Sequence, residues 1–518
     1  MNRYSRGQAR RSVFATAGFR LVSQAATLAS YVVLVREMTE ESFGVLSLLY
    51  AIVPVVSTVA SFGIEQTLRR FQPEYIARGE HSAAQWLYGI AARLRLLANL
   101  LVLGAVLAAW NLLAPVFGLA PFRGAFLLFC VVILLHFQVS LLKVSLASHM
   151  RNGLAVALTV ALPGVKLAGY SYAAWRGELT LELAILIDAA GYAATWLALR
   201  LAHERHRAGD GAGAGVEREP AERRRLGRYA LFNNFNDAGT LLLTAKSDNF
   251  FVAALLNAVA VGAYSFYTRL NEMVSQWLPI RQLADVIQPL LFAVPKLEAE
   301  RRLPRYFALL LNTTLAVQLP IAVYAAAFHA EIVAAVFAGK FAEWSWLLPV
   351  VVGFATLNRI AEPVTLVAQY QEKAGIILAS KVFGLYNAVA ILALAPAWGL
   401  LGVALATGTA QLMKNGFIWW HVRRTARWDN CGAVLLAYVA VGGGAYWACR
   451  AAADALEGGL WLDLACGAAI CGFATLVYLR TPALADSDRA ILASVFRGRE
   501  IRVLGWLGVV RPTATRTT

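Results

Sequence analysis

The chain has 518 residues, of which 59% are hydrophobic and only 15% are charged, whereas soluble domains average roughly 25% charged residues. A mean hydropathy of +0.58 over this length excludes a soluble enzyme, a disordered chain and a fibrous repeat, and it leaves a polytopic membrane protein. The formal net charge of +16 does not indicate nucleic acid as a partner, because the basic residues stand in bursts between apolar stretches and not on one solvated face.

Many stretches are long and apolar enough to cross a bilayer, which takes about 20 predominantly apolar residues. In chain order they are 13–35, 43–64, 88–114, 122–146, 153–175, 181–201, 228–256, 260–293, 306–328, 344–370, 374–395, 399–421, 431–451 and 459–479. The predicted fold class is therefore an all-α polytopic membrane protein with about 14 transmembrane helices. The cysteines lie within these stretches without ligand-like spacing, so we expect neither a metal site nor a disulfide framework.

Arginine and lysine concentrate in every second loop. The N-terminal segment, the connections after the second, sixth and eighth spans, and the C-terminal tail are all rich in arginine, whereas the opposite loops hold little beyond Arg36, Arg123, Arg176 and Lys340. Because basic loops are held on the cytoplasmic side, we expect both termini in the cytoplasm and the protein in the inner membrane of a bacterium.

The longest cytoplasmic connection, 203–227, is rich in Gly, Ala, Glu and Arg and is typical of a flexible linker. It divides the first twelve spans into two sets of six. The predicted organisation, in chain order, is an N-terminal lobe over 1–205, a cytoplasmic basic linker over 206–227, a C-terminal lobe over 228–426, an extra transmembrane helix pair over 427–480 and a cytoplasmic amphipathic tail over 481–518.

Two short matches indicate an internal repeat. Aligning 35–50 with 253–268 superposes Gly44 on Gly262 and Ser47 on Ser265, and the pair Ala-Trp at 174–175 matches the same pair at 397–398. Both matches have nearly the same offset, about the length of one six-helix half. The halves would be parallel repeats related by an axis along the membrane normal, and in transporters the substrate binds between such halves.

Four segments carry a resemblance to a known family. The run from Leu34 to Tyr75 (LVREMTEESFGVLSLLYAIVPVVSTVASFGIEQTLRRFQPEY), the run from Lys246 to Leu270, and the stretches FAGKFAEWSW at 337–346 and APAWGLLGVALA at 395–406 resemble Wzx-type polysaccharide flippases. These flippases belong to the multidrug/oligosaccharidyl-lipid/polysaccharide exporter superfamily. The similarity extends over roughly residues 10 to 425.

The resemblance implies a fold of two six-helix lobes with an appended helix pair, here 431–479, which lipid II flippases of the superfamily also carry. It further implies that the protein moves an undecaprenyl-diphosphate-linked oligosaccharide from the cytoplasmic to the periplasmic leaflet by alternating access, for O-antigen, capsule or exopolysaccharide synthesis. The expected partners are that lipid-linked oligosaccharide, membrane lipids, and the polysaccharide polymerase and chain-length proteins of the pathway.

Cations within the spans are the candidate binding residues. An ionisable side chain at a helix centre costs about 2.5–3.5 kcal/mol on insertion, so it marks a functional site by default. A cavity lined by such cations suits an anion such as a diphosphate. The candidates are Arg20, Lys166, Lys246, Arg269, Arg281 and Lys381. For Arg269 and Arg281 a local ion pair, with Glu272 and Asp285 on the same helix face, is the alternative.

The seventh span is the most polar, and its Asp237 and Asp248 are candidates for carrying a coupling proton or sodium ion. The alternative is that Asp237 caps the helix and Asp248 pairs with a neighbour. We expect no cofactor other than an ion gradient, and no catalytic residue, because the chain has no phosphate-binding Gly-rich loop, metal cluster or nucleophile motif.

Two other functions stay open. A cation-coupled multidrug exporter on the same fold would need acidic residues in the first lobe, where Asp188 is the main one. An integral-membrane glycosyltransferase or polymerase would need acidic residues on an extracytoplasmic loop, and Glu37, Glu40 and Glu41 lie on the first. The basic excess argues against the exporter, and the shortness of that loop argues against the enzyme. We therefore predict a flippase, which is a transporter and not an enzyme.

Overall fold

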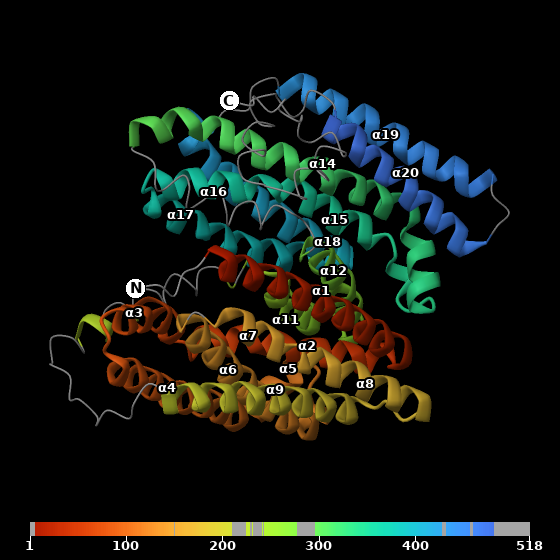
Figure 1. Ribbon diagram of the computed structural model, residues 1–518. Coiled ribbons are helices and arrows are strands. Elements are labelled where there is room, and N and C mark those ends of the chain that lie inside the picture. The colour runs from red at the N-terminus through yellow and green to blue at the C-terminus, as the bar shows by residue number, and fades with distance from the viewer. Residues whose placement is uncertain are drawn as a thin grey trace. The chain divides into compact units, whose positions relative to one another are not determined.

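The computed structural model describes residues 6–149, 151–209, 224–227, 230, 241, 243–276, 296–426, 431–455 and 459–480. Regular structure in these residues is helical throughout (Figure 1), which confirms the predicted all-α class. The contacts divide the chain into two compact units, Met1–Ser265 and Phe266–Thr518. This division falls inside one helix, and the domain boundaries predicted from the sequence stay predictions.

The helices of the first part of the chain are α1 (Arg6–Glu37), α2 (Glu40–Val59), α3 (Ile64–Ala77), α4 (His81–Ala108), α5 (Trp110–Val116), α6 (Arg123–Ser148), α7 (Asn152–Thr159), α8 (Ala161–Arg176), α9 (Leu181–Gly209), α11 (Ala245–Leu255) and α12 (Ala258–Gln276). Those of the second part are α14 (Lys296–Phe337), α15 (Leu347–Leu357), α16 (Ala361–Tyr370), α17 (Ala374–Ala379), α18 (Phe383–Val422), α19 (Cys431–Ala455) and α20 (Leu460–Arg480). Four short 3₁₀ turns join them: η1 (Ala120–Phe122), η2 (Ala342–Trp344), η3 (Asn358–Ile360) and η4 (Ser380–Val382).

Among the described residues, eleven helical segments are long and apolar enough to cross a membrane, so the protein is a multi-pass membrane protein. The predicted spans 374–395 and 399–421 both lie within one of these segments, Gly375–Val422, which is 48 residues long and is interrupted at Gly399. The predicted spans 228–256 and 260–293 lie partly outside the described residues, and their described parts are α11 and α12. The remaining ten predicted spans each correspond to one segment.

Proline breaks two spans that the sequence analysis took as continuous. A proline inside a helix removes a hydrogen bond, and its ring clashes with the carbonyl four residues earlier. For Pro163 that residue is Thr159, where α7 ends and α8 follows, and for Pro363 it is Arg359, inside the 3₁₀ turn that separates α15 from α16. The two spans are therefore pairs of shorter helices.

The connection between the predicted spans 374–395 and 399–421 turns on a glycine. Gly399 has φ 55° and ψ −136°, which interrupts α18, and residues with a Cβ rarely adopt this conformation. Just after the turn, a Cβ added to Gly402 would lie 2.4 Å from the carbonyl oxygen of Leu394. The two arms of α18 therefore approach each other as closely as backbones allow.

In the first unit α8 packs against both α1 and α9, and α6 packs against α9 and α4. In the second unit α14 is the central helix, in contact with α15, α16, α19 and α20. The appended pair, α19 and α20, is fastened to α14 by polar contacts as well as apolar ones. Arg450 on α19 forms an ion pair with Glu331 on α14 at 2.8 Å, and the Tyr438 hydroxyl donates to the carbonyl oxygen of Asn312 at 3.1 Å.

Candidate functional site

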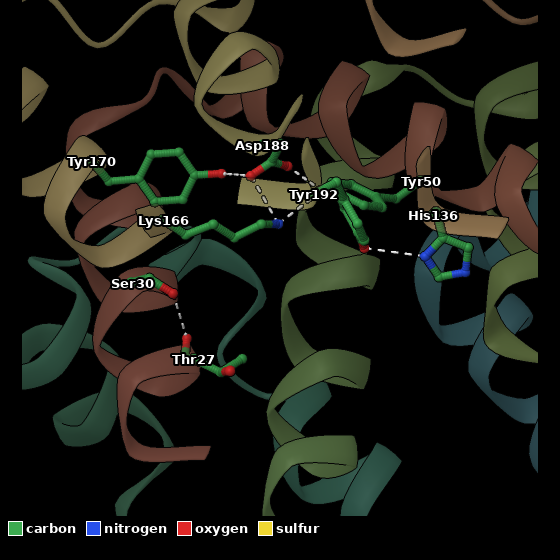
Figure 2. A network of polar contacts seen from close by, with 8 residues as sticks. All are labelled: Thr27, Ser30, Tyr50, His136, Lys166, Tyr170, Asp188 and Tyr192. Atoms are coloured by element: carbon green, nitrogen blue, oxygen red, sulfur yellow. Dashed lines mark hydrogen bonds and ion pairs between the residues drawn. The ribbon is translucent and has the colours of Figure 1, made fainter. Parts of the chain in front are cut away.

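A cluster of polar side chains lies inside the first unit where α2, α6, α8 and α9 meet (Figure 2). Helix α8 contributes Lys166 and Tyr170, and α9 contributes Asp188 and Tyr192. Each pair is spaced i, i+4, which places both members on one face of their helix. Because α8 and α9 pack along each other, the two polar faces meet in the interior.

An ion pair forms the centre of the cluster. The Lys166 ammonium lies 2.8 Å from the Asp188 carboxylate, and the Asp188 side chain is fully buried while that of Lys166 keeps 19% of its surface exposed. The Tyr50 hydroxyl, from α2, donates to one Asp188 oxygen and the Tyr170 hydroxyl donates to the other. The carboxylate therefore has a cation and two phenol donors, which together replace the water it loses on burial.

Aromatic rings surround the ammonium group. Lys166 Nζ also donates to the Tyr50 hydroxyl at 2.9 Å and lies 5.3 Å from the Tyr50 ring centroid and 5.6 Å from that of Tyr192. These distances are within cation–π range. The Tyr192 hydroxyl is 3.2 Å from His136 Nδ1 on α6, so the polar contacts extend from α8 through α9 to α6.

The cluster is a candidate functional site because its ion pair lies within membrane-spanning helices. A buried ion pair is weak evidence for stability, because desolvation of the two charges offsets much of their attraction. Ionisable side chains within membrane spans are costly and mark substrate or ion pathways. The pair is also asymmetric, since its acid is sealed and its base is partly exposed. Part of the Lys166 side chain is therefore accessible, whereas none of Asp188 is.

Asp248, on α11, is the second buried carboxylate among the predicted residues. It is fully buried and accepts a hydrogen bond from the Tyr264 hydroxyl on α12 at 2.8 Å. The next residue, Asn249, donates to the Ser265 hydroxyl, also on α12, at 2.8 Å. The structure thus gives Asp248 the neighbouring partner that was the alternative to ion coupling.

The other predicted residues differ in their exposure and in their contacts. Arg20 on α1 and Lys246 on α11 are exposed, and Lys381 in η4 is half-buried. Arg269 forms the expected local ion pair with Glu272, at 2.9 Å. Arg281 and Asp237 lie outside the described residues. Of the five predicted cations that the structure describes, Lys166 is the one that contacts Asp188.

The comparisons with known proteins identify the family. A family model described as "Polysaccharide biosynthesis protein" matches residues 9–283, slightly more than half of the chain. The chain belongs to this family. The match covers all four helices of the Asp188 cluster. A comparison with curated proteins finds no match.

Solved structures of transporters share the fold. One is the lipid II flippase MurJ in an inward closed conformation, with a TM-score of 0.68 and 12% identity over 89% of this chain and 97% of that chain. Another is a multidrug resistance MATE family transporter of the MOP superfamily in an inward-facing conformation, with a TM-score of 0.63 and 13% identity over 78% of this chain and 95% of that chain. These identities establish a common fold and nothing finer. The two-lobe fold class implied by the sequence resemblance is thereby confirmed.

The sequence analysis of this polysaccharide biosynthesis protein found Lys166 but not its surroundings. It looked for partners of Lys166 along α8, whereas the partner lies on the next helix. Asp188 itself had a usable signal, because it is a carboxylate within an apolar stretch. Tyr50 and His136 had no such signal in the sequence, because a tyrosine or histidine in a membrane helix is common and its neighbours depend on tertiary packing.

Proposed function

We propose that this protein is a flippase for a lipid-linked oligosaccharide, and that Lys166 is a contact for the diphosphate that joins the lipid to the sugar. Membership of the polysaccharide biosynthesis family and a fold shared with a lipid II flippase support the substrate class. The observation that carries the proposal is the Lys166–Asp188 pair, in which the cation keeps an exposed edge and its carboxylate is sealed.

The diphosphate needs a cation because it leaves water when it crosses the membrane interior. A charge-assisted hydrogen bond from an ammonium group to a phosphate oxygen compensates part of that loss. Arg20 and Lys246, exposed on helices of the same unit, are proposed as further contacts. The polyprenyl chain stays in the lipid, and two alternating conformations expose the bound headgroup first to the cytoplasm and then to the periplasm.

We propose that Asp188 sets the strength with which Lys166 holds the diphosphate. The Asp188 carboxylate competes with the diphosphate for the Lys166 ammonium. The phenol groups of Tyr50 and Tyr170 contact both carboxylate oxygens, so they can stabilise the carboxylate when Lys166 turns to the substrate. Asp237 and Asp248 stay predictions for an ion-coupling role.

A cation-coupled exporter is the second candidate, because Asp188 is a buried acid in the first unit of the kind that such an exporter would need. The structure argues against it, since the Lys166 ammonium occupies the position where a cationic drug would pair with Asp188. The two functions differ in substrate charge. The exporter would confer resistance to organic cations, and the flippase would not.

The test is leaflet-resolved measurement of lipid-linked oligosaccharide in cells that lack the protein and are complemented with variants. We expect cytoplasm-facing accumulation that wild type reverses and that Lys166→Met reverses at least about tenfold more slowly, since a charge-assisted hydrogen bond contributes roughly 1.5–3 kcal/mol. Lys166→Arg keeps the charge and should retain part of the activity. Arg176→Gln, which changes an exposed cation on the same helix, is the matched control.

Two outcomes decide between the proposals. Delivery of the lipid-linked unit to the periplasmic leaflet at a normal rate without this protein would refute the flippase. Normal activity of Lys166→Met at wild-type protein levels would refute the role of Lys166 while leaving the flippase intact. For Asp188→Asn, which removes the competing carboxylate, we expect flipping that saturates at a lower substrate concentration, and an unchanged concentration dependence would refute the competition between Asp188 and the diphosphate.

A further inference from the structure

Arg95 on α4 is a buried cation that forms no ion pair with any acidic residue in the described part of the chain. Its side chain is 1% exposed. Two of its nitrogens donate to the backbone oxygen and hydroxyl of Ser57 on α2, each at 3.4 Å, and its guanidinium group lies 4.1 Å from the ring centroid of Phe137 on α6. The third nitrogen, Nε, has no hydrogen-bond partner. Glu65 on α3 affects Arg95 only through long-range electrostatics and forms no ion pair with it.

One turn further along α4, Asn99 is buried in the same way. It is fully buried, and neither its amide nitrogen nor its amide oxygen has a hydrogen-bond partner. Residues spaced i, i+4 lie on one helix face with their Cβ atoms about 5–6 Å apart. The Nε of Arg95 is the guanidinium nitrogen nearest its own Cβ. The two groups without partners, Nε–H and the Asn99 amide, therefore belong to one small region beside α4.

These groups need a ligand with a negative charge. A buried polar group without a partner costs about 1–3 kcal/mol, and a buried charge costs more. Native proteins satisfy such groups with ordered water or a bound ion. Water would satisfy the Asn99 amide, but it would leave the charge of Arg95 uncompensated, and within the described residues no carboxylate lies within 4 Å of Arg95.

We propose that Arg95 Nε and the Asn99 amide bind a small monovalent anion, with chloride as the physiological ligand. The burial of both side chains excludes a sugar or a polyprenyl diphosphate. The Phe137 ring lies over the guanidinium group, and Ser57 occupies its other two nitrogens, so the ion would bind at Nε. The anion would neutralise Arg95 and stabilise the packing of α4 against α2 and α6, independently of the flippase function proposed for Lys166.

The test uses the purified full-length protein in detergent micelles. Thermal unfolding is followed while potassium chloride or bromide replaces potassium gluconate at constant ionic strength. We expect a saturable rise of the melting temperature with either halide for the wild type and for Arg93→Met, which changes an exposed arginine two residues away on the same helix. Asn99→Leu, which leaves every charge in place, and Arg95→Met should lose that rise.

A second measurement does not depend on the variants folding. Broadening of the ³⁵Cl NMR line by the wild-type protein, reversed by bromide, reports chloride binding directly. Equal melting temperatures in halide and gluconate together with an unbroadened chloride line would overturn the proposal. So would a halide response that both Asn99→Leu and Arg95→Met retain, because the anion would then bind elsewhere.

Discussion

Breaking the Lys166–Asp188 ion pair from either side should destabilise the protein, whereas replacing both charges should not. Removing one partner of a buried pair costs about 3–5 kcal/mol, because an uncompensated charge stays behind. We expect Lys166→Met to lie at the upper end, since it leaves a fully buried carboxylate, and Asp188→Asn to lie lower, since Lys166 is 19% exposed and keeps its 2.9 Å contact with Tyr50. The double variant Lys166→Met/Asp188→Leu should come close to wild type.

The measurement is reversible unfolding in mixed micelles, with a double-mutant cycle to isolate the pairwise energy. Arg200 and Glu204 are the matched control, because they form an ion pair at the same 2.8 Å on α9 but are each about half exposed. Exposed pairs contribute about 0–1 kcal/mol. If the single variants at the buried pair cost no more than Arg200→Met, or if their effects simply add in the double variant, the electrostatic reasoning is wrong.

Two predictions concern the appended helix pair, α19 and α20. Gly467→Ala should lower the free energy of unfolding by about 1–3 kcal/mol through overpacking, because its Cβ would lie 2.2 Å from the buried ring of Phe328. The control is Gly472→Ala on the same helix, whose Cβ meets nothing within 4 Å and which should be neutral or stabilising. Unfolding in mixed micelles compares the two variants, and equal effects would contradict the packing. The sulfur atoms of Cys449 and Cys471 lie 3.9 Å apart. In a variant that lacks the other cysteines, oxidation with copper-phenanthroline should therefore join them in a disulfide, which is measured as loss of maleimide labelling. Persistent labelling would contradict the contact.

The fold was predictable because hydropathy alone determines which stretches cross a membrane. The breaks inside two of the spans, near Pro163 and Pro363, were not predicted. Proline alone does not locate such breaks, because Pro54 and Pro320 lie inside the helices α2 and α14 without ending them.

The candidate site was predictable in two separate residues, Lys166 and Asp188, but not in the contact between them. Lys166 attracted attention because an isolated lysine in an apolar stretch is costly. Its role depends on Asp188, and that partnership arises from the packing of α8 along α9, which no pattern within either helix specifies. The same holds for Arg95, which the sequence analysis passed over. Whether a cation in a span is paired, exposed or buried alone is a property of tertiary structure.

The two glycines that indicated the internal repeat lie against each other in the structure. A Cβ added to Gly44 on α2 would lie 1.8 Å from the carbonyl oxygen of Ala258 and 3.3 Å from the backbone nitrogen of Gly262 on α12. Gly44 therefore has no room for a Cβ, so glycine at this position is a requirement of packing and not only a feature of the sequence pattern.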